Sequence, residues 1–108
     1  MRVTAVVAGG WAALLLATGA SAAAGQPAKT ITIDKLAFAP APAALRVGDT
    51  VVWSNRDMFQ HSATARDGSF DLNLKPGASA RVRLTRPGVI RYYCRFHPGM
   101  TGELRVLR

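Results

Sequence analysis

The sequence predicts an all-β protein, a sandwich of about eight short strands, and two observations lead to this fold class. Apolar and polar residues alternate along most of the chain, which is the pattern of strands with one buried face. Gly, Pro and Asp residues interrupt these runs at spacings of about 8–12 residues, as is typical of a β-sandwich or barrel. Beyond residue 24, no window keeps a helical period long enough to predict a helix.

Each expected strand is bounded by turn residues. The expected strands, in order, are residues 30–34, 45–47, 50–54, 61–64, 70–74, 80–84, 89–94 and 103–107. The first alternates with Ile31 and Ile33 on one face, and residues 50–54 are rich in β-branched and aromatic side chains. Prolines at 40 and 42 predict an irregular connection after the first strand. The turns between later strands are expected at residues 48–49, 55–57, 67–68, 76–77 and 87–88.

Residues 1–24 have the layout of a secretory signal peptide. Arg2 is followed by an apolar run over residues 3–20, and small residues then offer cleavage sites ending at Ala22 or Ala24. The alternative interpretation of this run is an uncleaved membrane anchor. We expect cleavage, which leaves residues 25–108 as one monomeric domain, periplasmic or otherwise exported, with no stable membrane insertion.

The expected exported domain is basic. Removing Arg2 from the 14 basic side chains leaves 13 against 6 acidic ones, a formal charge of +7. Such a charge favours an acidic partner or an anionic surface. The arginines are scattered and several alternate with apolar residues, so no nucleic-acid partner is expected.

Cys94, His97 and Met100 follow one another at three-residue steps where the strand at 89–94 ends. Cys94 is the only cysteine, and an unpaired thiol in an exported protein needs another role, which metal binding provides. His61 is the only other histidine and lies in a different expected strand. Two imidazoles, one thiolate and a weak thioether are the ligands of a blue-copper electron-transfer site, whereas zinc rarely uses Met. We therefore expect one type 1 copper ion per chain.

With these residues in view, the chain resembles the cupredoxins, and among them the amicyanin-like members. The resemblance is carried by residues 38–40, 47–51, 53–55, 76–77 and 87–94 and by the short Cys-x-x-His-x-x-Met loop. Plastocyanins and azurins usually have longer ligand loops. The resemblance implies a Greek-key sandwich, with His61, Cys94 and His97 as strong copper ligands and Met100 as the weak axial ligand.

One position departs from the family pattern. Cupredoxins commonly place Asn directly after the first His ligand, where its side chain ties the two ligand loops together. This chain has Ser62 there, and a hydroxyl makes a similar bond over a shorter reach. We expect Ser62 and Asn55 to hold the ligand residues in position without binding the metal themselves.

Three classes of function were compared. Catalysis by a multicopper enzyme is not expected, because no histidine remains to build a second copper site. A Cys–His nucleophile would leave Met100 without a role. A periplasmic copper carrier or chaperone of the same fold stays open as the alternative to transfer of single electrons between redox partners.

Apolar residues flank the ligands in the sequence and predict a docking patch around the edge of His97. The expected patch consists of Met58, Phe59, Arg95, Phe96 and Pro98. In the alternative interpretation, Phe96 only caps the end of the sandwich. The basic charge predicts an acidic redox partner, such as a c-type cytochrome, a dehydrogenase or an oxidase.

Overall fold

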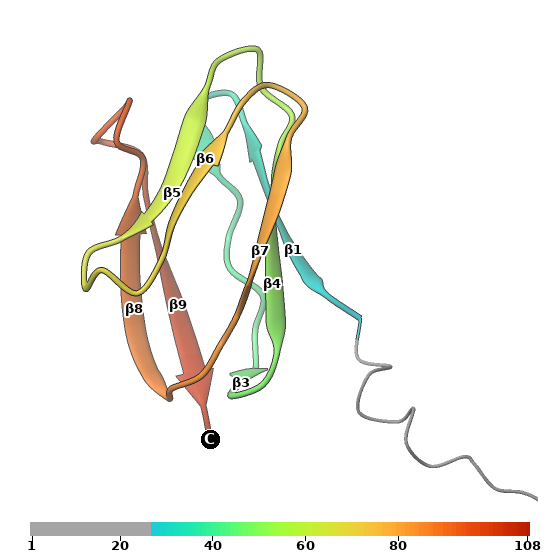
Figure 1. Ribbon diagram of the computed structural model, residues 1–108, viewed down its shortest axis with the longest axis vertical. Coiled ribbons are helices and arrows are strands. Elements are labelled where there is room, and N and C mark those ends of the chain that lie inside the picture. Colours follow the sequence, from blue (N-terminus) through green and yellow to red (C-terminus); the bar gives the residue numbers. More distant parts are fainter. Residues whose placement is uncertain (1–26) are drawn as a thin grey trace, which may run out of the picture.

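The computed structural model describes residues 27–108 as two β-sheets packed face to face (Figure 1). The signal peptide expected over residues 1–24 lies outside the described residues. The strands are β1 (Lys29–Asp34), β2 (Ala37–Phe38), β3 (Leu45–Arg46), β4 (Thr50–Asn55), β5 (His61–Ala65), β6 (Asp71–Leu74), β7 (Ser79–Arg83), β8 (Gly88–Tyr93) and β9 (Thr101–Leu107). The predicted all-β sandwich is confirmed.

One sheet has the order β2-β1-β4-β7 and the other the order β3-β9-β8-β5-β6. The chain changes sheet repeatedly, so neighbours within a sheet are often distant in sequence. β1 runs parallel to β4, and β3 runs parallel to β9, while the other pairs are antiparallel. Among residues 27–108, no helix is long and apolar enough to cross a membrane.

The short strand β2 was not expected, because the prolines that follow it predict an irregular connection. Ala37 and Phe38 pair with Asp34 and Ile33 of β1 before Pro40 removes a backbone donor. The tight turn between β1 and β2 holds Lys35 and Leu36 at positive φ angles of 51° and 59°. Such angles are uncommon for residues with side chains, so other contacts must hold this turn in place.

The core lies between the sheets and is built on an aromatic cluster. The Trp53 ring lies 5.1 Å from the Phe70 ring and 5.3 Å from the Tyr92 ring, measured between centroids. A Cβ atom at Gly102 would lie 2.3 Å from Cζ of Tyr92, so only glycine leaves room for this ring. The fully or nearly buried apolar side chains are Ile31, Ile33, Leu45, Val51, Trp53, Ala63, Ala65, Phe70, Leu74, Leu84, Tyr92, Cys94, Met100, Leu104 and Val106.

Two loops meet at one end of the sandwich and carry the residues expected to bind metal. The loop at residues 56–60 leads into β5, and the loop at residues 94–100 connects β8 to β9 (Figure 1). We call this end the ligand end. The strands therefore bring together residues from the middle and from the C-terminal part of the chain.

Candidate metal centre

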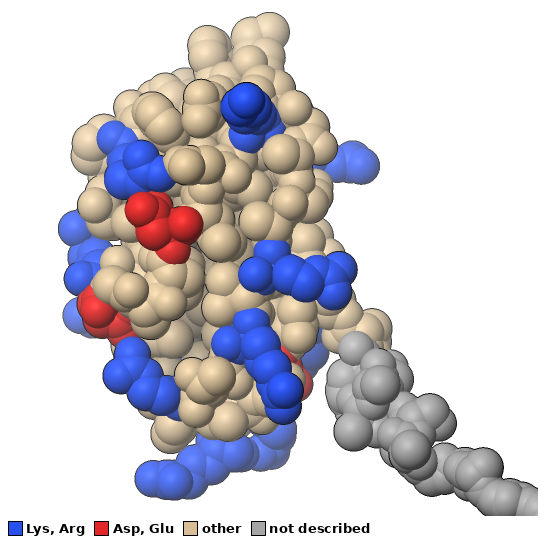
Figure 2. Space-filling model, in the orientation of Figure 1, with Lys and Arg blue, Asp and Glu red and all other residues tan. Residues whose placement is uncertain are grey.

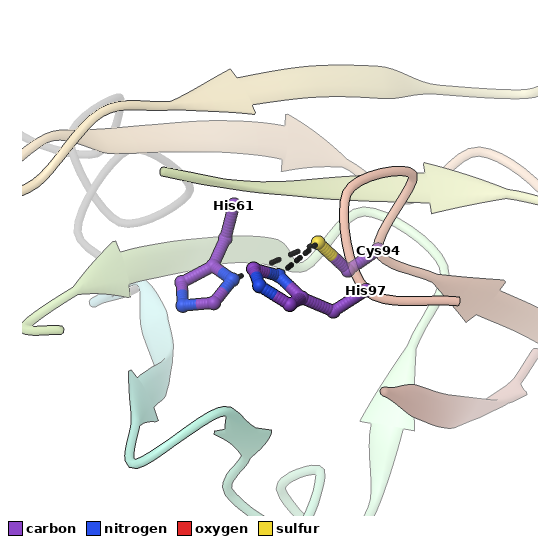
Figure 3. A group of neighbouring side chains, drawn as sticks. All are labelled: His61, Cys94 and His97. Carbon is purple, nitrogen blue, oxygen red and sulfur yellow. Dashed lines mark hydrogen bonds between the residues drawn. The ribbon is translucent and has the colours of Figure 1, made fainter. Parts of the chain in front are cut away.

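Three metal-ligating side chains converge at the ligand end (Figure 3). His61 is the first residue of β5 and Cys94 follows β8, and both are fully buried; His97 is half-buried on the loop between β8 and β9. Nδ1 of His61 lies 3.7 Å from Sγ of Cys94, and Nδ1 of His97 lies 3.9 Å from the same sulfur. One ligand atom from each of the three residues falls within 4.8 Å of the others, so one ion can contact all three.

A carboxylate fixes the orientation of the His61 ring. Nε2 of His61 lies 2.9 Å from Oδ2 of Asp57. Donation of the Nε2 proton to this carboxylate leaves Nδ1 unprotonated and facing Cys94, as a metal ligand must be. The contact therefore selects the tautomer that binds metal.

Asp57 is itself held by backbone amides. Leu36 donates its N–H to Oδ2 of Asp57, and Met58 donates to Oδ1, both over 2.9 Å. The hydrogen bond from His61 and then the Leu36 amide hold the pKa of Asp57 below its usual value of 3.8. The contact from Leu36 also ties the strained turn between β1 and β2 to the metal centre.

Asp57 is a residue of this site that local sequence patterns do not reveal. The sequence indicates only a turn at residues 55–57. An acid four residues before a histidine is visible in the sequence, but this spacing shows a contact only once the loop conformation is known.

The buried side chain of Asn55 holds the loop at residues 56–60. Its Nδ2 donates to the carbonyl oxygens of Phe59, at 2.8 Å, and of Leu74, at 2.9 Å. Its Oδ1 accepts the backbone N–H of Asp57 at 2.9 Å. Asn55 thus places the loop that carries Asp57 and fixes it to strand β6.

Ser62 contacts the segment that carries Cys94 through both its backbone and its side chain. Its backbone N–H donates to Sγ of Cys94 at 3.3 Å, and its Oγ accepts the backbone N–H of Arg95 at 2.8 Å. Its hydroxyl is also 2.9 Å from Oγ1 of Thr64, which donates to Asp71 at 2.8 Å. Because Thr64 donates to the carboxylate, the Ser62 hydroxyl is the donor to Thr64. These contacts hold Ser62 against both the Cys94 sulfur and the backbone that follows it.

Met100 lies on the same closed loop as Cys94 and His97. Its backbone N–H donates to the carbonyl of His97 at 2.8 Å, and its carbonyl accepts the N–H of Cys94 at 3.0 Å. The Met100 side chain is 6% exposed and belongs to the core cluster that includes Cys94. These two backbone hydrogen bonds fix the backbone positions of Cys94, His97 and Met100 relative to one another.

The side chains expected to form a docking patch are all exposed: Met58, Phe59, Arg95, Phe96 and Pro98. Among residues 27–108, Met58 is the most exposed large apolar residue, at 77%. The ring of Phe59 lies 6.2 Å from that of His97, between centroids. The Arg95 guanidinium lies 5.3 Å from the Phe96 ring centroid and pairs with Asp71 at 3.0 Å. The half-buried His97 is thus bordered by an exposed aromatic ring.

Comparison with known proteins agrees with this geometry. Residues 5–106 match the family described as cupredoxin-like domain. The chain is similar to the reduced state of an amicyanin mutant at 30% identity, over 79% of this chain and 89% of that one, with a TM-score of 0.64. An oxidised amicyanin mutant matches at 28% identity with a TM-score of 0.65, and the Cu(I) form of another at 29% with 0.63, over the same shares of both chains.

The donor set fits copper. The site combines one sulfur with two imidazoles whose Nδ1 atoms face that sulfur, and this is a soft ligand set that suits copper. The hydrogen bond that Asp57 accepts from His61 and the one that the Ser62 amide donates to Cys94 hold these ligand side chains in position. Together with the matches above, these observations show that the chain belongs to the cupredoxin-like family and is an amicyanin-like copper protein.

Proposed function

We propose that this protein is exported to the periplasm and carries single electrons between two redox proteins through one type 1 copper ion. In this proposal His61, Cys94 and His97 are the strong ligands and Met100 is the weak axial ligand. The observation that carries the proposal is the convergence of three ligand atoms within 4.8 Å from two separate segments of the fold.

The ligands are held by contacts that do not depend on a metal. Asp57 orients His61, the Ser62 amide points at the Cys94 sulfur, and two backbone bonds close the loop at residues 94–100. Copper bound here would supply reversible one-electron chemistry. A rigid ligand set limits the rearrangement that accompanies electron transfer, which suits a carrier.

The exposed patch suggests where a partner docks. The His97 ring is half-buried beside Phe59, so its edge offers a short route from the ligands to the surface. Apolar surface around a buried redox site is typical of an interaction surface. Arg95 beside Phe96 favours an acidic partner, such as a c-type cytochrome, a dehydrogenase or an oxidase.

Copper addition tests the proposed site. We expect one Cu(II) per chain and an intense visible band from the thiolate-to-copper transition, and Cys94→Ser should abolish the band. Ser69→Ala, on the exposed loop between β5 and β6, is the control and should leave the band unchanged. A colourless protein that prefers zinc would contradict the proposal.

The proposed axial ligand requires a separate experiment. Met100→Leu should retain copper but shift the reduction potential, because a weak axial bond tunes the metal without holding it. Loss of copper from both Met100→Leu and Met100→Gln would show that Met100 has another role. Absence of reversible voltammetry, together with rapid release of copper to an acceptor, would instead favour the copper carrier.

A further inference from the structure

The end of the sandwich opposite the ligand end carries exposed basic side chains. We call this region, formed by residues 46–49, 83–89 and 105–108, the far end. Arg46, Arg83 and Arg108 are exposed there, and no aspartate or glutamate side chain of residues 27–108 forms a salt bridge with them. The Arg46 guanidinium donates to the backbone oxygen of Arg108 at 2.7 Å. The Arg83 guanidinium lies near Gly48, because a Cβ atom built on that glycine would be 4.0 Å from Nη2 of Arg83. Figure 2 shows basic side chains at this end as well as on the rest of the visible face.

Exposed apolar side chains lie among these arginines. Val47, Val89 and Leu107 are 40%, 49% and 51% exposed. Val47 donates its backbone N–H to the carbonyl of Leu107 at 2.8 Å, so these two residues are direct neighbours. Val89 pairs with Arg105 across β8 and β9. The far end is therefore both basic and partly apolar.

The N-terminal strand starts at the same end. Lys29, the first residue of β1, pairs with Val51, and the preceding residue of β4, Thr50, pairs with Arg83. The residues before β1 include the apolar run at 3–20, which contains no charged side chain. Until it is removed, the apolar N-terminal segment is therefore joined to the domain at the far end.

We propose that the far end is a docking surface for a lipid bilayer that contains anionic headgroups. Arginines at such a surface are attracted to the headgroups, and apolar side chains between them enter the interfacial region. Each basic residue near an anionic bilayer increases the binding constant about fivefold. Docking through this end leaves the ligand end facing away from the membrane, accessible to redox partners. This inference goes beyond the proposed function and does not depend on the metal.

The charge and the distribution of the side chains favour a bilayer as the occupant. The apolar side chains are interspersed with the arginines at the end of the sandwich, and interfacial binding uses both kinds of contact. An anionic bilayer complements the positive charge of this end.

Vesicle binding tests the proposal. The copper-loaded protein of residues 25–108 is suitable, because both sheets and the core lie within residues 29–107. We expect it to sediment with vesicles containing phosphatidylglycerol but not with pure phosphatidylcholine vesicles, and added salt should weaken this binding. Arg83→Gln with Arg108→Gln should lower the binding constant about 25-fold, since each arginine contributes about fivefold.

A matched pair of substitutions separates local docking from diffuse charge. Arg56→Gln with Lys75→Gln removes the same charge from exposed positions near the ligand end and should leave binding almost unchanged. Val47→Ser with Leu107→Ser should also weaken binding without any change of charge. Equal losses in the two charge variants would overturn the proposal, as would absence of vesicle binding. Binding of soluble polyglutamate but not of vesicles would identify an acidic protein as the partner and would also overturn it.

Discussion

Replacing Asp57 with asparagine would test whether this carboxylate tunes the copper site through His61. The carboxylate oxygen Oδ2 lies 2.9 Å from Nε2 of His61 and also accepts the Leu36 amide. Asparagine keeps the size of the side chain and one acceptor oxygen, but it removes the negative charge. If the asparagine oxygen faces His61, the NH2 group of the side chain faces the Met58 amide. The Met58 amide then has no acceptor. The variant therefore changes the charge behind the ligand more than its position.

The expected size of the effect follows from the role of such contacts in metal sites. Mutation of a residue that is hydrogen-bonded to a ligand typically lowers metal affinity about 10–100-fold. A nearby negative charge stabilises Cu(II) more than Cu(I), so we expect the loss to fall mainly on the oxidised form. At about 59 mV per factor of ten for a one-electron couple, the reduction potential should rise by about 60–120 mV.

The assay is protein-film or solution voltammetry of the copper-loaded protein, with the visible spectrum recorded to show that the ligand set is intact. Asp67→Asn is the matched control, because Asp67 lies on the exposed loop between β5 and β6, where it pairs with Arg86. It carries the same change of net charge and should leave the potential almost unchanged. An unchanged potential in Asp57→Asn, or an equal rise in both variants, would refute the reasoning.

Three further predictions concern stability. Ser62→Ala should lower the free energy of unfolding by about 1–3 kcal/mol, measured by chemical denaturation, because the Arg95 amide loses its acceptor. Gly102→Ala should cost about 1–3 kcal/mol or more in the same assay, since its Cβ would overlap the Tyr92 ring. The Arg46 amide and then Lys29 lower the pKa of Asp49 from its usual 3.8, so the stability it contributes is present above pH 3.8 and is lost as pH falls below that value. Asp49→Asn should therefore flatten the acid side of a plot of stability against pH, and an unchanged slope would contradict this assignment.

Local patterns in the sequence were enough to predict the fold class and the ligand types. Alternation of apolar and polar residues reports directly on the two faces of a strand, so most strands were predicted to within two residues. The three-residue steps from Cys94 to His97 and Met100 place these residues on one turn, and their chemistry points to copper. The signal peptide over residues 1–24, the axial role of Met100, the docking patch and the redox partner stay predictions.

The sequence suggested Ser62 and Asn55 as supporting residues, but the tertiary structure alone decided which atoms they contact and placed Asp57 against His61. The bond from the Arg95 amide to the Ser62 hydroxyl joins residues 33 positions apart, and Leu36 reaches Asp57 across 21. Such contacts depend on how loops fold back on the sheets, which short-range periodicity does not describe. The same reason applies to the far end, where arginines separated in sequence become neighbours only because β3, β7 and β9 terminate or turn together. A strand pattern depends on nearest neighbours, whereas a site depends on the packing of segments that the sequence keeps apart.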